Sequence, residues 1–280
     1  MLRLSILTLL TLCAFAGNSV LCRVALKDTA IDAASFTSIR LASGALVLWL
    51  IARARADARD GRGNWLSALA LFAYAAPFSF AYEGLSAATG ALLLFGAVQV
   101  TMIGAGLLRG ERLQLLQWSG LSLALIGLVG LLLPGLTAPP LGAATMMLGA
   151  GVAWGLYSLR GRGAGDPTRV TAGNFARAAP MALALSLLTL PQLQLDTAGI
   201  GYAIASGAIA SGMGYALWYS VLPSLQATHA ATLQLSVPVI AALAGMLLLD
   251  EALSWRFTVA SIAILGGIAL VIARRGPRRS

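Results

Sequence analysis

Two glutamines, Gln99 and Gln234, lie deep within apolar stretches of this sequence, where polar side chains are costly. Phe95 lies four residues before Gln99 and Pro238 four residues after Gln234, so each pair shares one face of a helix. Polar groups in such stretches usually face a cavity, where an amide can bind a polar group of a ligand. The alternative is that both amides hydrogen bond to neighbouring helices. We predict that Gln99, Gln234, Phe95 and Pro238 contact a small-molecule substrate.

Aromatic side chains gather in two groups on four of the apolar stretches, and we predict that one group lies near the outer opening and the other near the inner opening. Large planar rings with few rotatable bonds suit gates that close over a substrate. The alternative is the aromatic belt of membrane proteins, but a belt would decorate every stretch. The first group is Phe15, Phe78, Phe80 and Tyr82 with Asn18, and the second is Trp154, Tyr157, Tyr215, Trp218 and Tyr219. Within these groups, the predicted substrate-binding residues are Asn18, Phe78, Tyr82, Trp154, Tyr157 and Trp218.

Charged side chains are rare within the apolar stretches. Arg40 and Arg177 each lie about two helical turns inside one, and we predict that they snorkel or bond to backbone carbonyls. Substrate contact is the alternative for both. Of the acidic residues, only Asp32 and Glu83 approach a predicted span, each at its end, so no mid-membrane carboxylate is expected to bind sodium or relay protons.

Residues that would support catalysis are also missing from the sequence. No Gly-rich phosphate loop precedes a lysine, and no His/Cys/Asp cluster has the spacing of a metal site. Cys13 and Cys22 share one apolar run and indicate neither a disulfide framework nor a metal site. We therefore expect no cofactor, no metal, no catalytic residue and no enzymatic activity.

The composition indicates an all-α integral membrane protein. Hydrophobic residues make up 59% of the 280 residues and charged residues only 10%, against roughly 25% in soluble domains. The net charge of +9 does not indicate a nucleic-acid partner, because the arginines occupy short corners between apolar runs, as expected beside a lipid bilayer. Ten stretches are long enough to span a membrane: 3–22, 32–52, 64–84, 86–108, 113–133, 140–159, 170–190, 198–221, 226–249 and 255–273.

The chain contains an internal repeat. Residues 88–131 align without a gap on residues 227–270, at a shift of 139 that pairs Ala88-Thr89 with Ala227-Thr228 and Glu111 with Asp250. We predict two domains, a first five-helix repeat at 1–138 and a second at 139–280. Because five is odd, the second repeat must enter the membrane from the opposite side, which gives an inverted-topology repeat around a central cavity.

Loop charges predict that both termini are cytoplasmic. Under this topology fourteen arginines lie on the cytoplasmic side and three basic residues outside. Gln99 and Gln234 then lie at one depth, roughly 12–14 Å from the cytoplasmic surface. The expected location is a bacterial inner membrane, crossed several times. The inner set is Arg3, Arg53, Arg55, Arg59, Arg62, Arg109, Arg112, Arg160, Arg162, Arg169, Arg274, Arg275, Arg278 and Arg279, and the outer set is Arg23, Lys27 and Arg256.

These features resemble the drug/metabolite transporter superfamily in its EamA-type, ten-helix form. The resemblance rests on the repeat, on Ala16-Gly17-Asn18-Ser19, on Arg40, and on the corners Gly110-Glu111-Arg112-Leu113 and Asp250-Glu251-Ala252-Leu253. Family members usually carry Trp-Gly in helix 1, where this chain has Ala16-Gly17, whereas Trp154-Gly155 keeps the pair in helix 6. The family implies a basket of helices 1, 3, 4, 6, 8 and 9, with helices 5 and 10 peripheral. Among its branches, the chain looks most like bacterial exporters of aromatic amino acids, the YddG type.

Three functions fit the sequence. The first is export of small amphipathic metabolites, amino acids including aromatic ones, by alternating access. The second is an integral-membrane enzyme or lipid-handling protein, which the missing acid–base cluster disfavours. The third is a small-pore channel, which single-channel currents would reveal. The oligomeric state stays open.

Overall fold

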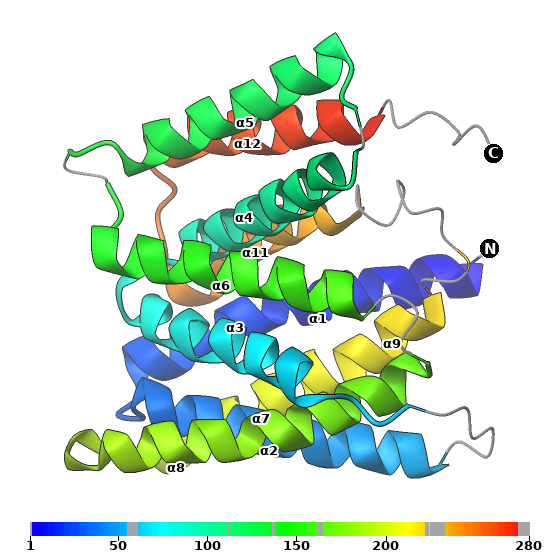
Figure 1. The fold of residues 1–280 in the computed structure, drawn as a ribbon. Helices are drawn as coiled ribbons and strands as arrows, with labels where there is room; N and C mark the ends of the chain where they lie inside the picture. The colour runs from blue at the N-terminus through cyan, green and yellow to red at the C-terminus, as the bar shows by residue number, and fades with distance from the viewer. Residues whose placement is uncertain are drawn as a thin grey trace.

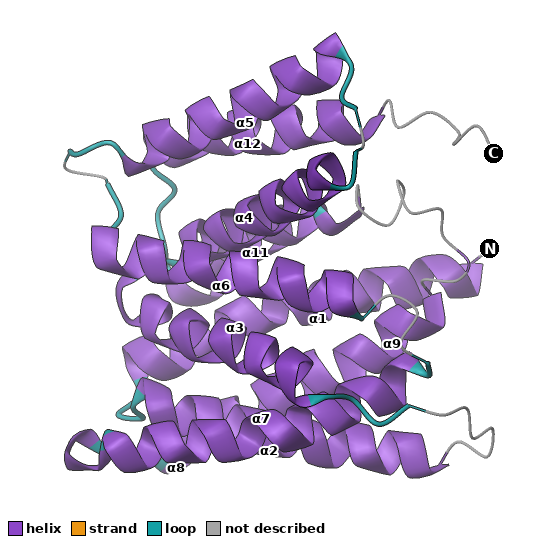
Figure 2. Ribbon diagram, viewed as in Figure 1, coloured by secondary structure: helices purple, strands orange, loops and turns teal. Residues whose placement is uncertain are grey.

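The computed structural model describes residues 2–54, 61–110, 112–135, 138–161, 165–221, 224 and 233–273. Within these ranges the chain forms helices and connecting loops and no strand, as Figure 2 shows. The helices lie roughly side by side, and α1 begins at the end of the bundle where α12 finishes (Figure 1). Glu111, one of the repeated corner residues, lies outside the described residues.

Helical segments occur at every predicted range. Within the predicted stretch 226–249, the structure describes residues 233–249. Three consecutive segments, α8, the π-helix η2 and α9, follow one another without a break over Thr197–Val221. The bounds are α1 Leu2–Asp28, α2 Ala33–Ala54, α3 Trp65–Gly84, α4 Ala87–Leu108, α5 Leu115–Leu132, α6 Leu141–Arg160, α7 Pro167–Leu188, η1 Leu190–Gln192, α8 Thr197–Ile204, η2 Ala205–Met213, α9 Gly214–Val221, α11 Ser236–Leu249 and α12 Trp255–Ala273.

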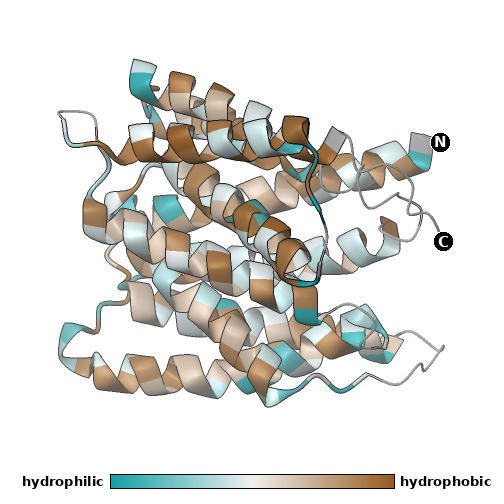
Figure 3. Cartoon of the chain, turned by 45° about the horizontal axis from the view of Figure 1, so that its top comes forward, coloured by the Kyte–Doolittle hydropathy of each residue, from teal (hydrophilic) through white to brown (hydrophobic). Residues whose placement is uncertain are grey.

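Seven helical segments in the described ranges are long and apolar enough to cross a membrane. They are α1 to α5, the continuous segment Thr197–Val221, and α12. The α11 helix is apolar but has 14 residues, and α6 and α7, with 20 and 22 residues, are not among the seven. Hydrophobic residues run along the helices and hydrophilic ones concentrate toward the loops (Figure 3). The chain is therefore an all-helical membrane protein with multiple spans.

Side-chain caps set several of the helix starts. Asn64 accepts a hydrogen bond from the Ser67 backbone and begins α3, and Ser86 does the same for α4. Asp166 begins α7 and Asp196 begins α8 in the same way. Each cap satisfies a backbone N–H that the first turn of a helix leaves without a partner.

The contacts between helices follow the internal repeat. At the shift of about 139 residues, α1 to α5 correspond to α6, α7, α8–α9, α11 and α12. Corresponding helices pack on each other, α2 on α7, α4 on α11 and α5 on α12. The contact of α3 with α6 is repeated by the contact of α1 with α8, η2 and α9, because α6 corresponds to α1 and the α8–α9 segment corresponds to α3. The α5–α12 pair forms one edge of the bundle and touches the rest mainly through α4, as the resemblance implied (Figure 1).

Two glycines bring α6 close to α4. A Cβ at Gly151 would lie 2.6 Å from the Ala97 Cβ, and one at Gly155 would lie 2.9 Å from the Thr101 Cβ. This spacing of four residues is the small-residue pattern that lets membrane helices approach closely. The contact fixes α6, and with it Trp154, against the centre of the bundle.

Candidate functional site

Arg40 lies at the centre of the bundle and does not reach a surface. Its side chain is only 1% exposed, and Nη2 donates a hydrogen bond of 2.8 Å to the Tyr74 hydroxyl. The guanidinium carbon lies 4.7 Å from the ring centre of Phe78 and 5.2 Å from that of Tyr74. Nε and Nη1 are buried and have no hydrogen-bond partner among the described residues. The prediction that Arg40 snorkels or bonds to backbone carbonyls is therefore wrong, because α2 turns this position toward α3 and not toward the membrane surface.

A chain of hydrogen bonds extends from Arg40 through both halves of the sequence. The Tyr74 hydroxyl also accepts a hydrogen bond of 3.2 Å from Asn18 Nδ2. Asn18 Oδ1 accepts a further one of 2.7 Å from the Ser206 hydroxyl. These four buried side chains, which we call the Arg40 network, come from α1, α2, α3 and η2. Asn18 therefore faces the interior of the bundle, and its contact with a substrate stays a prediction.

Ser206 stands on a π-helix of nine residues, Ala205–Met213. The π-helical stretch is uncommonly long, and such stretches often occur at functional sites. Gly207 packs its Cα directly on the backbone of Arg40, since a Cβ there would overlap the Arg40 carbonyl oxygen and the Ser43 hydroxyl. Close contact of η2 with α2 thus places Ser206 and Arg40 in one layer.

Aromatic rings surround the Arg40 network on the side of α6 and α9. The Trp154 ring centre lies 4.9 Å from that of Tyr74, 5.3 Å from Tyr157 and 5.2 Å from Tyr215. Trp154 is stacked on Tyr157 and Tyr215, at interplanar angles of 27° and 19°. The rings therefore form a platform directly beside the network.

The two aromatic groups predicted from the sequence are one continuous cluster. Phe15 of the first group lies 5.8 Å from Tyr215 and 6.0 Å from Trp218, both of the second group. The prediction of two separate groups is wrong, because α1 runs to Asp28 and so places Phe15 at its middle. Trp218 is buried beside Phe15 and does not stand alone at an opening.

Phe78 and Tyr82 continue the cluster toward one end of the bundle. Their ring centres lie 4.8 Å apart and both side chains are fully buried. The Tyr82 hydroxyl is 3.5 Å from the Ala87 carbonyl, and its ring packs against Gly90. Phe78 touches the Arg40 guanidinium, whereas Tyr82 fills the space between α3 and α4.

Arg177 behaves as the sequence predicted. It donates to the Gly173 carbonyl at 2.8 Å and to the Arg62 carbonyl at 2.6 Å. Next to it, the Asn174 amide bonds to the Tyr157 hydroxyl at 3.3 Å and accepts from the Asn64 backbone at 2.9 Å. The repeat partner of Arg40 is thus a structural residue that holds the segment before α3.

The predicted glutamine pair lies on neighbouring helices. Gln99 and Phe95 are buried on α4, at 4% and 6% exposure, and Pro238 is buried on α11. Gln234 is half-buried just before α11. Neither amide hydrogen bonds to another side chain or carbonyl in the described ranges, so the alternative of hydrogen bonding between helices finds no support there. Their contact with a substrate stays a prediction.

Acidic residues in the described ranges lie near helix ends. Asp32 precedes α2 and accepts hydrogen bonds from the backbones of Ser35 and Gln194, at 2.9 and 3.0 Å. Partial burial acts to raise the pKa of Asp32, but these hydrogen bonds outweigh it and hold the pKa below its usual value. No three metal-ligating side chains come together in that part of the chain.

One ion pair closes an end of the bundle. We call this the Arg23 end; it holds the C-terminal ends of α1, α3 and α11 and the start of α4. Arg23 Nε lies 3.0 Å from Glu251 Oε1, and Arg23 Nη1 donates to the Tyr82 and Glu83 carbonyls at 2.8 and 3.1 Å. Glu251 Oε2 also accepts from the Ala87 backbone at 2.8 Å. These bonds tie the four helix ends together.

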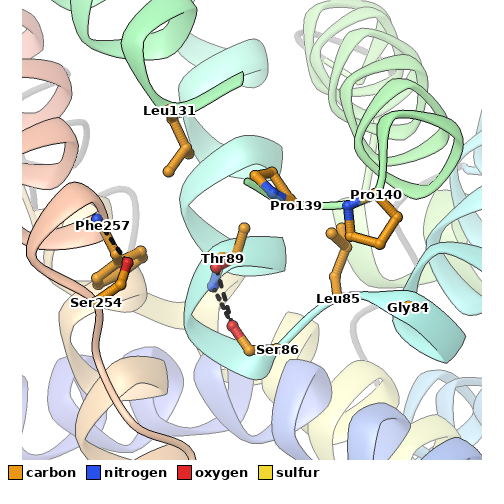
Figure 4. Close-up of a pocket in the computed structure, with 9 residues that line it drawn as sticks. All are labelled: Gly84, Leu85, Ser86, Thr89, Leu131, Pro139, Pro140, Ser254 and Phe257. Atoms are coloured by element: carbon orange, nitrogen blue, oxygen red, sulfur yellow. Dashed lines mark hydrogen bonds between the residues drawn. The ribbon is translucent and has the colours of Figure 1, made fainter. Parts of the chain in front are cut away.

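A small pocket of about 160 Å³ opens at the same end, as Figure 4 shows. It lies away from the Arg40 network, and Ser86 and Thr89 are already bonded to each other in its wall. No charged side chain lines it. The pocket is lined by Gly84, Leu85, Ser86, Thr89, Leu131, Pro139, Pro140, Ser254 and Phe257.

The network contains two residues that sequence reasoning missed, Tyr74 and Ser206, and one that it placed wrongly, Arg40. Tyr74 lies four residues before Phe78 and therefore on its helical face, which was a usable signal. Ser206 carries no such signal, because it stands in a run of small residues that suits any helix contact.

Comparisons with known proteins agree with this architecture. The model of the EamA-like transporter family matches residues 3–133 and 141–273. An uncharacterized protein of Pseudomonas aeruginosa is 60% identical over 98% of this chain and 96% of its own length. An uncharacterized transporter of Archaeoglobus fulgidus is 36% identical over 27% of this chain and 28% of its own. A solved crystal structure, 21% identical, shares the fold over 95% of this chain and 96% of its own, with a TM-score of 0.67. The chain thus belongs to the EamA-like transporter family.

Proposed function

We propose that this protein exports small amphipathic metabolites, amino acids including aromatic ones, across a bacterial inner membrane by alternating access. The observation that carries the proposal is the Arg40 network, a buried polar centre with side chains from both repeats. Transporters with inverted repeats bind substrate between the repeats and rock one against the other. Polar side chains at Asn18, Arg40 and Tyr74 suit the polar group of such a substrate, and the Trp154 platform suits its apolar part.

The proposal includes the topology. We take the chain as ten spans in two inverted repeats, 1–138 and 139–280, with both termini in the cytoplasm. The Arg23 end then faces outward, and the arginine-rich loops face the anionic inner leaflet. Gln99, Gln234, Phe95 and Pro238 line the path from the cytoplasm toward the Arg40 network.

Counterflow in proteoliposomes tests this proposal. Vesicles preloaded with unlabelled phenylalanine should accumulate labelled phenylalanine transiently above its equilibrium level, because a carrier exchanges substrate across the membrane. A channel passes the label only down its gradient and gives no such overshoot. The matched control is vesicles without protein, loaded identically. Absence of an overshoot for phenylalanine, tryptophan and leucine, from protein that is folded in the vesicles, would refute the amino acid proposal.

A further inference from the structure

We infer that Arg40 binds the carboxylate of the substrate, and that the site prefers amphipathic carboxylates to amines of the same shape. The inference rests on the proposed function and names the substrate class of that same site. It starts from the donors that the guanidinium leaves unused. Nε and Nη1 together carry three N–H groups and are buried without a partner in the described ranges. Buried polar groups in proteins nearly always have hydrogen-bond partners, so the unpaired N–H groups of this permanently charged guanidinium call for an explanation.

The charge of Arg40 also has no acidic partner among the described residues. The groups that contact the Arg40 guanidinium are the neutral rings of Tyr74 and Phe78 and the Tyr74 hydroxyl. The ion pair found in the described residues, Arg23 with Glu251, involves a different arginine. A buried charge is stabilised when an opposite charge reaches it with good hydrogen-bond geometry, and arginine matches a carboxylate especially well. A ligand carboxylate would provide both the negative charge and the hydrogen-bond acceptors for Arg40.

The surroundings define the rest of the ligand. Phe78 and Tyr74 pack on the guanidinium, so a carboxylate must approach its edge, where the unused donors lie. Trp154 lies 4.9 Å from Tyr74 and stacks on Tyr215, which offers planar apolar surface one ring away from the charge. A carboxylate joined to an apolar or aromatic body matches this arrangement. No described acidic side chain touches the network, so a ligand ammonium would have no ionic partner there.

The repeat supplies a matched control for this argument. Arg177 has the same position in the second repeat, but it donates to the Arg62 and Gly173 carbonyls. Its charge therefore has backbone acceptors, and it lies away from the network. Substitution of Arg177 removes the same charge from the protein as substitution of Arg40 and leaves the site intact.

Isothermal titration of the purified protein in detergent, at fixed ionic strength, tests the inference. The ligands are 3-phenylpropionate, phenylalanine and phenethylamine, which share one ring and differ in charge. We expect 3-phenylpropionate to bind, phenylalanine to bind no tighter, and phenethylamine to bind at least about tenfold more weakly. Arg40→Gln should weaken 3-phenylpropionate binding by about tenfold or more, Arg40→Lys by less, and Arg177→Gln by less than about twofold.

A second measurement separates binding from folding. Because Arg40 carries an uncompensated charge, ligand-free Arg40→Gln should unfold at a temperature no lower than that of the unsubstituted protein. If Arg40 were purely structural, the same substitution would lower the unfolding temperature. Equal binding of 3-phenylpropionate and phenethylamine would overturn the inference, as would unchanged binding in Arg40→Gln. Phenylalanine counterflow that persists in Arg40→Gln overturns the inference and leaves the proposed function intact. Binding that depends on Arg40, without amino acid counterflow, would support the inference and refute the proposed export of amino acids.

Discussion

Gly207→Ala should lower the thermal unfolding temperature by about 5 °C or more and abolish substrate counterflow. The added methyl group would overlap the Arg40 carbonyl oxygen and the Ser43 hydroxyl. Backbone atoms cannot move aside singly, so α2 and η2 would have to separate along their contact. That separation moves Arg40 on α2 away from Ser206 on η2, which breaks the layer in which the network forms. Unfolding followed by circular dichroism in detergent, together with counterflow in vesicles, measures both effects.

Gly201→Ala is the matched control. Gly201 lies on α8, six residues earlier in the same continuous helix, and a Cβ there meets no atom within 4 Å. Alanine favours helix over glycine by up to about 1 kcal/mol, so this variant should unfold at the same or a slightly higher temperature. If the two variants unfold alike, the contact of η2 with α2 is looser than the structure indicates.

Glu251→Gln should speed the modification of Cys22 by about tenfold or more, because it breaks the ion pair that closes the Arg23 end. Cys22 is fully buried on α1, directly before Arg23. The glutamine can still accept a hydrogen bond from the Ala87 backbone, so the change removes the charge and leaves the packing. A water-soluble thiol reagent, used on a Cys13→Ser background since Cys13 is exposed, reports the opening of this end.

Two further variants test whether the ion pair itself, and not charge in general, keeps the Arg23 end closed. Arg23→Glu combined with Glu251→Arg restores the charge pair in reverse but not the bonds to the backbones of Tyr82, Glu83 and Ala87, so it should return the modification of Cys22 only part of the way to its original rate. Arg256→Gln removes a charge at the same end, where Arg256 donates to the Leu133 carbonyl, and should leave the rate unchanged. A rate that responds equally to Arg256→Gln and Glu251→Gln would show that charge at this end matters and the ion pair does not.

The helical fold could be predicted from the sequence because its main signal is local. Long apolar runs separated by charged corners predict membrane helices, and helical segments lie at each of the predicted ranges. The repeat predicted which helices correspond, and the structure packs three of these pairs on each other, α2 on α7, α4 on α11 and α5 on α12. Helix ends were harder, since α1 continues six residues past its predicted end, through Arg23 and Lys27. Both side chains bond to groups on other elements, which a sequence window cannot register.

The candidate site was predictable only in part, because its key contacts join residues distant in sequence. Asn18, Phe78 and Trp154 could be selected as candidates because amide and aromatic side chains are conspicuous in apolar runs, but their contacts with Tyr74 and Arg40 could not be predicted. Arg40 and Arg177 looked alike in the sequence, and nothing local distinguishes them. Their difference arises from what lies opposite, a tyrosine hydroxyl for Arg40 and two backbone carbonyls for Arg177.

The unpaired Arg40 has an electrical consequence. If Arg40 binds the substrate carboxylate and the protein exports it, as we propose, the guanidinium stays with the protein and a ligand without an ammonium group carries one net negative charge out of the cell. An inside-negative membrane potential then favours export by about 2.3 kcal/mol per 100 mV for each monoanion. That corresponds to roughly a fiftyfold concentration ratio. Had the arginine been matched by a fixed carboxylate, the resting site would be neutral and would offer an anion no uncompensated charge. A site that selects anionic cargo by an unpaired arginine would thus let the membrane potential drive export of that cargo, while a zwitterionic amino acid would move without this contribution.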